Sequence, residues 1–140
     1  MKHLIAIAAF ALAFVASVQA SEPTLGQKFA AISDGHSHAA NSPEVKNATQ
    51  LLDAAAKKYR TTPDAIANLV VIGYNESKKK NYSYSMYEVA EALPVLDPRT
   101  TSTDERAKQL MVQYIVARAG GQTHSEAVVG VRKFTEVENP

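Results

Sequence analysis

From residue 43 onwards, apolar residues recur every three or four positions, which is the spacing of amphipathic helices. The first such stripe runs through Val45, Ala48, Leu52, Ala55 and Tyr59, while lysines and other polar residues fall on the opposite side. Ser42, Pro43 and Glu44 precede it. Serine is a preferred N-cap, proline suits the first helical position, and an early acid complements the helix dipole. The pattern predicts a helix over 43–59.

The same start pattern returns at Thr62, Pro63 and Asp64, and it precedes a stretch that is apolar nearly all round. Residues 65–74 read AIANLVVIGY, and the polar run 75–80 follows them. An apolar stretch of this length is compatible with a buried strand or a buried helix. The Thr-Pro-Asp start favours a helix, which we expect to be the central one.

A capping box at Ser85 and Glu88 opens a shorter helix, because each of these side chains satisfies a free backbone N–H of the other's residue. We expect this helix to reach Leu93 and to stop at Pro94. A loop over 95–102 follows.

Two helices are predicted beyond this loop. The first spans about 103–119, where Val112 and Val116 widen its apolar face, and two consecutive glycines end it. A second capping box, formed by Thr123 and Glu126, opens the last helix, whose inward side includes Phe134. The fold class is therefore all-α, a compact bundle of four to six short helices packed around 65–74 and 107–119.

The first twenty residues have a different character. Lys2 precedes an uncharged apolar stretch over 4–18, and small or compact residues, Val18 and Ala20, stand at the two positions that a signal peptidase reads. This three-part pattern predicts a cleavable signal peptide over 1–20, with cleavage before Ser21. The apolar stretch is shorter than the roughly 20 residues that a membrane span needs. We therefore expect a bacterial protein that is periplasmic or secreted and has no membrane span after cleavage.

The rest of the chain divides into two parts. Residues 21–42 are the loosest segment, and we expect a flexible N-terminal stretch with a short helix over 24–32. Residues 43–137 form the helical domain. No Gly/Ser linker or low-complexity run divides it.

Charge and cysteine content narrow the class of partner. The chain has 15 Lys+Arg against 14 Asp+Glu, and residues 1–20 hold one lysine and no acid, so the remainder is neutral. A nucleic-acid binder usually carries a basic excess. This argues against DNA binding by the two helices within 103–134, whose outline is that of a helix-turn-helix. The absence of cysteine excludes a lipid-modified cysteine anchor.

One candidate site is the histidine loop, made of Asp34, His36 and His38. Two imidazoles and a carboxylate suit zinc or copper, and His124 could complete the ligand set. The spacing matches no established metal motif. The alternative is a solvated loop whose histidines have no ligand.

A second candidate is a surface rich in tyrosine and lysine. Its members lie close together in the sequence: Lys78, Lys79, Lys80, Tyr82, Tyr84 and Tyr87. Tyrosine offers a rigid apolar face with a hydroxyl, and lysine offers charge, so the group suits a peptide, a glycan or an anionic partner. The alternative is that the lysines complement a helix C-terminus and the tyrosines cover a turn or enter the core.

The sequence contains no recognisable catalytic motif. Glu88 and Glu91 would share one side of a helix, yet Glu88 is already used in a capping box. There is no cysteine, no Gly-x-Ser-x-Gly elbow and no phosphate loop. We therefore expect a small exported, non-catalytic binding module without a cofactor, such as an inhibitor or immunity-type protein, whose partner is another protein or an envelope component. The competing hypothesis is a metal-binding protein or metal-dependent enzyme that uses the histidine loop.

Overall fold

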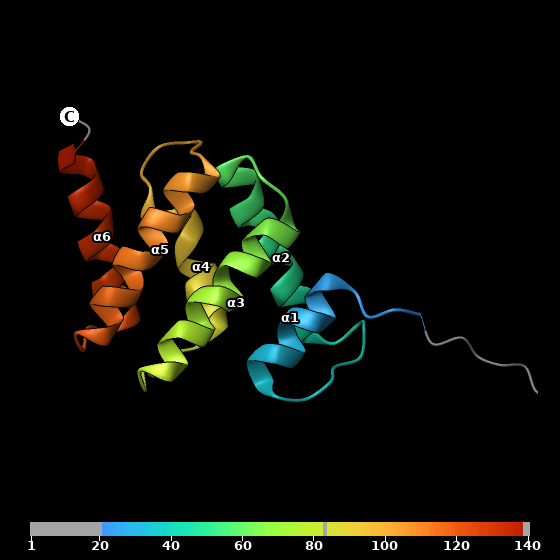
Figure 1. The fold of residues 1–140 in the computed structure, drawn as a ribbon. Helices are drawn as coiled ribbons and strands as arrows, with labels where there is room; N and C mark the ends of the chain where they lie inside the picture. Colours follow the sequence, from blue (N-terminus) through green and yellow to red (C-terminus); the bar gives the residue numbers. More distant parts are fainter. Residues whose placement is uncertain (1–20, 83, 139–140) are drawn as a thin grey trace, which may run out of the picture.

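Each helix in the part of the chain that the structure describes begins at a hydroxyl side chain that caps its first turn. A computed structural model describes residues 21–82 and 84–138, which form six α-helices and contain no strand (Figure 1). The helices are α1 (Leu25–Asp34), α2 (Pro43–Tyr59), α3 (Pro63–Lys79), α4 (Met86–Leu96), α5 (Asp104–Ala119) and α6 (His124–Glu138). Their caps are Thr24, Ser42, Thr62, Ser85, Thr103 and Thr123. The predicted all-α bundle is confirmed.

The core is centred on α4, which packs against α2, α3, α5 and α6. Its buried residues are Met86, Val89, Ala90, Ala92, Leu93 and Leu96. The prediction that 65–74 would form the central helix is wrong, because one side of α3 has no neighbour and Ile72 is 63% exposed there. A nearly all-apolar sequence shows that a helix has the capacity to be buried, but the other helices decide how much of it they cover.

Pro94 does not stop α4, which continues to Leu96. A proline this close to the end of a helix removes one backbone donor in the last turn only. The burial of Leu93 and Leu96 on either side of it holds that turn in place.

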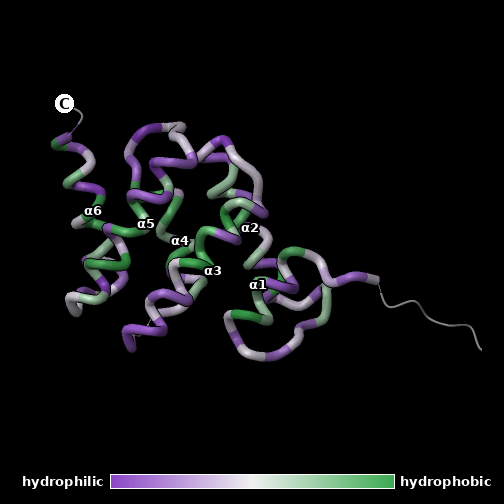
Figure 2. Tube along the Cα trace, in the orientation of Figure 1, coloured by the Kyte–Doolittle hydropathy of each residue, from purple (hydrophilic) through white to green (hydrophobic). Residues whose placement is uncertain are grey.

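The outer surfaces of α5 and α6 also differ from expectation. Val112, Val116 and Phe134 are 55%, 63% and 53% exposed, although the apolar pattern predicted that they would be buried. In Figure 1, α6 lies at one end of the bundle beside α5, and no further helix within residues 21–82 and 84–138 covers them there. Figure 2 shows apolar segments continuing along both helices out to this end.

α1 is an integral part of the bundle, and the short helix predicted over 24–32 is confirmed. It packs on α2 and α3, with Phe29 and Ala30 buried. Gly26 permits the close approach, because a Cβ there would lie 2.3 Å from Oγ1 of Thr49 and 3.0 Å from the carbonyl oxygen of Val45. A helix that contributes to the core therefore lies before residue 43.

The predicted signal peptide, 1–20, lies outside the described residues. Within 21–82 and 84–138, none of the helices has the length and apolarity needed to cross a membrane.

Candidate functional site

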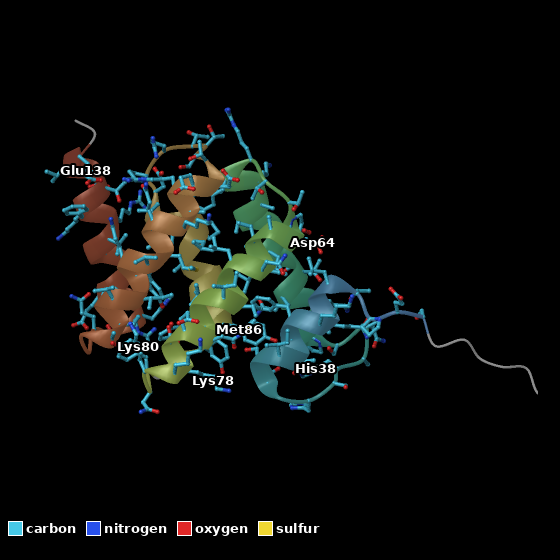
Figure 3. All side chains as sticks on the ribbon, viewed as in Figure 1. His38, Asp64, Lys78, Lys80, Met86 and Glu138 are labelled. Atoms are coloured by element: carbon cyan, nitrogen blue, oxygen red, sulfur yellow. The ribbon has the colours of Figure 1, made fainter. Side chains whose placement is uncertain are left out.

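The structure divides the tyrosine- and lysine-rich surface into separate environments. Lys78, Tyr82 and Tyr84 line one pocket, whereas the side chain of Lys79 points to solvent and pairs with Glu76 at 2.6 Å. Lys80 lies on the other side of α3, in a groove between α3 and α5. Figure 3 shows Lys78 and Lys80 at the same end of α3, near Met86.

Tyr87 also lies apart from this pocket. Its ring packs edge-on against Phe29, with centroids 5.8 Å apart, and its hydroxyl donates to Asp34 at 3.4 Å. Burial and the neighbouring Asp34 carboxylate raise the pKa of Tyr87 to about 12. Tyr87 thus joins α4 to α1.

We call the pocket around Lys78 the tyrosine pocket. It has a volume of about 930 Å³ and opens where the ends of α1, α3 and α5 meet the start of α4. Its lining residues are Ser33, Tyr74, Lys78, Asn81, Tyr82, Tyr84, Ser85, Glu88 and Arg118. Three aromatic rings, two cations and one carboxylate therefore border a single open space.

The end of α3 places the exposed tyrosine of this pocket. Asn81 adopts a left-handed conformation, with φ 59°, which asparagine tolerates better than most residues. The Tyr82 N–H then donates back to the Ser77 carbonyl at 3.1 Å, which closes the helix end. Tyr82 remains 37% exposed, whereas Tyr84 is only 8% exposed.

Tyr84 forms the inner wall of the pocket. Its hydroxyl donates to the Gly73 carbonyl at 3.4 Å. Burial raises the pKa of Tyr84 to about 12, so the hydroxyl stays protonated at neutral pH. Of the three tyrosines predicted as a contact surface, Tyr82 is the one whose ring is open to a partner, and Tyr84 supports it from the core.

Glu88 and Arg118 make a largely buried ion pair in the wall, with Arg118 Nη1 3.1 Å from Glu88 Oε1. The capping box is confirmed, since the Ser85 N–H donates to Glu88 and the Glu88 N–H donates to Ser85 Oγ. Burial alone would raise the pKa of Glu88, but the Ser85 and Arg118 hydrogen bonds outweigh it and the pKa falls below its ordinary value. Glu88 is thus ionised and fully engaged.

The Glu88–Arg118 pair contacts the core through Tyr114, which is fully buried. Arg118 donates to the Tyr114 hydroxyl at 3.0 Å, and Nδ1 of His124 lies 2.7 Å from the same oxygen. This chain of contacts ties the start of α4 to α5 and α6.

Lys78 has no anionic partner among the described residues. Its Nζ lies 5.5 Å from the centroid of the Tyr74 ring and is exposed at the mouth of the pocket. Arg118, by contrast, is neutralised by Glu88. The net charge of the pocket is therefore carried by one lysine beside exposed aromatic surface, an arrangement that suits a carboxylate attached to an apolar or planar group.

Arg118 was not predicted to be a site residue. It lies on the same face of α5 as Leu110, Met111 and Tyr114, all of which are buried. A charged residue on a buried face needs a partner. That mismatch was the available signal, but the identity of the partner, Glu88 on another helix, depends on the packing.

The histidine loop does not assemble as a set of metal ligands. His38 pairs with Asp34, Nε2 to Oδ2 at 2.8 Å, and its other ring nitrogen lies 3.8 Å from Glu44 Oε2. The ring of His36 lies against that of His38, with centroids 4.5 Å apart, and its Nδ1 is 3.2 Å from the Asp34 backbone carbonyl. His124 lies elsewhere, in contact with Tyr114. In residues 21–82 and 84–138, no three His, Cys, Asp or Glu side chains converge as metal ligands would.

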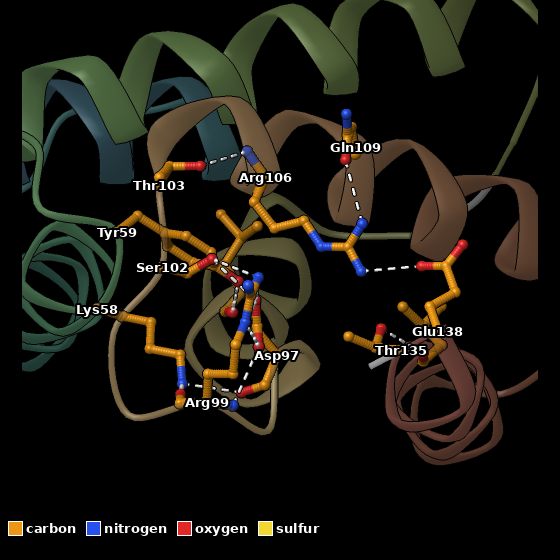
Figure 4. A network of polar contacts seen from close by, with 12 residues as sticks. Lys58, Tyr59, Asp97, Arg99, Ser102, Thr103, Arg106, Gln109, Thr135 and Glu138 are labelled. Atoms are coloured by element: carbon orange, nitrogen blue, oxygen red, sulfur yellow. Dashed lines mark hydrogen bonds and ion pairs between the residues drawn. The ribbon is translucent and has the colours of Figure 1, made fainter. Parts of the chain in front are cut away.

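A second polar network lies at the other end of α4, around the fully buried carboxylate of Asp97 (Figure 4). Arg99 approaches it through its backbone N–H and its guanidinium, and Ser102 Oγ donates at 2.8 Å. Lys58 on α2 donates to the carbonyls of Asp97 and Arg99. Burial opposes the ionisation of Asp97, but the Arg99 and Ser102 hydrogen bonds outweigh it and hold its pKa far below the ordinary value. The network fastens the α4–α5 loop to α2.

Comparisons with known proteins identify one relationship. The sequence model of the MoxZ family matches residues 13–136, which is most of the chain, so the protein belongs to the MoxZ family. No curated protein and no solved structure matches it.

Proposed function

We propose that this member of the MoxZ family is an exported, non-catalytic binding protein that holds an acidic segment of a partner protein in the tyrosine pocket. The observation that carries the proposal is Lys78, which is the one cation without an anion among the described lining residues and lies beside the exposed Tyr82 ring. A glutamate or aspartate side chain would supply the missing anion. Export itself rests on the leader pattern of residues 1–20.

The electrostatics of the wall favour binding over catalysis. Glu88 is the only carboxylate among the described lining residues, and the Ser85 N–H and Arg118 hold it in its ionised form. A general acid or base works best with a pKa near the operating pH, whereas the pKa of Glu88 is lowered. Ser85 is already part of a helix cap, which leaves it poorly placed to act as a nucleophile.

A peptide titration tests the binding step. The full chain would be expressed in a bacterial host and purified from the compartment it reaches, with its N-terminus set by intact mass. Isotope-labelled protein would be titrated with a tetraglutamate peptide and, as a neutral control, with tetraglutamine. We expect amide shifts centred on 74–88 and Arg118 with the first peptide only.

Matched variants locate the contact. Lys78→Ala should weaken binding of tetraglutamate about tenfold, in line with loss of one charged contact. Lys79→Ala removes the next charge of the same helix, which points away and pairs with Glu76, and should leave binding unchanged. Equal weakening by both variants would indicate a general charge effect and would refute the pocket as the site. A purified protein whose N-terminus is not Ser21 would refute the prediction that residues 1–20 are a cleaved signal peptide.

A further inference from the structure

The outer side of the bundle opposite α1 carries an apolar face that none of the described helices covers. Val112 and Val116 form a ridge along α5, with a groove on each side. The groove toward α6, which we call the α5/α6 groove, has a volume of about 490 Å³. Its lining residues are Val112, Gln113, Val116, Ala117, Gln122, Gly130, Val131 and Phe134. Exposed apolar surface spread over neighbouring helices is a mark of an interaction surface.

No close contact within the described residues requires a glycine at position 130, which lies in this groove. Glycine inside a helix costs about 1 kcal/mol relative to alanine. At Gly73 the cost is explained, because a Cβ would lie 2.9 Å from Met111 Cε where α3 crosses α5. At Gly130 the nearest atom to a Cβ would be Gln122 Oε1 at 3.8 Å, and the position is exposed. The missing side chain instead deepens the groove and lets another backbone approach α6.

The charges around this face are suited to a copy of the same surface. The α5/α6 groove is lined by no charged residue, and its polar residues are Gln113 and Gln122. An amide both donates and accepts, so two related glutamines can pair with each other. The groove on the other side of the ridge carries one acid, Glu76, which pairs with Lys79 of its own chain at 2.6 Å, and one base, Lys80. With one acid and one base among its lining residues, this groove adds no net charge to the face.

The net charge of the chain points the same way. Beyond the leader the acidic and basic residues balance, so two copies meet without electrostatic repulsion. A strongly charged partner, in contrast, would find nothing complementary in a neutral groove.

We infer that the protein forms a two-fold symmetric dimer through this face, with the Val112/Val116 ridge of one copy seated in the α5/α6 groove of the other. A two-fold interface uses the same patch on both copies, which a ridge flanked by a groove satisfies. None of the residues lining the α5/α6 groove lines the tyrosine pocket, whereas the groove on the other side of the ridge shares Tyr82 with it. The inference does not depend on the proposed function.

Light scattering after size-exclusion chromatography tests the dimer, with the full chain expressed and processed as above. Wild-type protein should have twice its chain mass at about 100 µM, a concentration at which even a weak specific dimer is populated. Val116→Glu places a charge on the exposed ridge and should weaken dimerisation about a hundredfold, because that charge would be buried without a partner. Val129→Glu is the matched control, since Val129 is 50% exposed on α6 but does not line either groove.

Each possible result of these measurements either supports or refutes the dimer. A dimer that persists in the Val129→Glu variant and is lost in the Val116→Glu variant supports the inference, provided that circular dichroism shows both variants folded. A wild-type monomer at this concentration overturns it. A dimer that survives Val116→Glu overturns it too, because association would then use another face, and equal loss in both variants would show unspecific association.

Discussion

Replacing Asp97 with asparagine removes the charge at the centre of the network that fastens the α4–α5 loop, while nearly preserving the side chain's volume. The carboxylate is fully buried and accepts from the Arg99 N–H, the Arg99 guanidinium and Ser102 Oγ. Asparagine has one acceptor oxygen instead of two. That one oxygen can accept from the Arg99 backbone N–H, or from the Arg99 Nη2 and Ser102 Oγ donors on the other side of the carboxylate, but not from both groups.

The expected cost follows from these contacts. One buried donor left without an acceptor costs about 1–3 kcal/mol, and the remaining hydrogen bonds lose the strength that an ionised acceptor gives them. The Arg99 side chain is 47% exposed, so water recovers part of its loss. We expect Asp97→Asn to lower the free energy of unfolding by about 2–4 kcal/mol, which corresponds to about 10 °C in Tm for a domain of this size.

The pH dependence gives a second, independent signature. The folded pKa of Asp97 lies below its ordinary value, so the stabilisation is present above the unfolded pKa of about 3.9 and is lost as pH falls toward the folded pKa. The asparagine variant has no such group. The difference in the free energy of unfolding between wild type and variant should therefore be about 1 kcal/mol smaller at pH 3 than at pH 7.

Urea unfolding followed by circular dichroism at pH 7 and pH 3 measures both effects. Asp53→Asn is the control, because Asp53 is exposed on α2, and it should change stability by less than about 0.5 kcal/mol. The reasoning fails if Asp97→Asn is as stable as wild type at pH 7, or if its deficit is the same at pH 3. In the first case the buried carboxylate would be energetically neutral, and in the second its charge would not be the source of the stabilisation.

Three further measurements test the packing and the electrostatics. Leu93→Ala in the core of α4 should cost about 2–5 kcal/mol in urea unfolding, whereas Val95→Ala, 43% exposed on the same helix, should cost well under that. Gly26→Ala should lower the free energy of unfolding by about 1–3 kcal/mol, because its methyl group would meet the α2 backbone. Gly130→Ala, measured in dilute protein, should raise it by up to about 1 kcal/mol. Equal effects of the two substitutions would contradict the packing of α1. Tyr84 should ionise near pH 12 in an ultraviolet titration of the folded protein. Because folding raises its pKa, its contribution to stability should be fully present below about pH 10 and be lost as the pH rises toward 12. Ionisation of Tyr84 near pH 10 in the folded protein would show that its ring is not buried.

Local signals in the sequence were sufficient to determine the helices. Helix starts depend on a hydroxyl side chain and the few residues after it, so the caps at Ser42, Thr62 and Ser85 could be read directly, and the structure has each of them. The exception was Pro94, which ends a helix only when no packing compensates for the lost donor. Proximity in the sequence also found part of the site, since Lys78, Tyr82 and Tyr84 do line one pocket.

Only the tertiary structure decided which helix is central, which apolar stripes stay exposed and which charges meet. An apolar stripe shows that a surface can be buried, but the neighbours that bury it come from distant parts of the chain. α4 is central because six of its 11 residues are buried, against five of 17 in α3, whereas no neighbour in the described part of the chain covers the ridge formed by Val112 and Val116. The Glu88–Arg118 pair likewise joins residues thirty positions apart. Side-chain chemistry alone does not specify such a pairing, because any buried cation can be satisfied by any carboxylate that the fold brings near it.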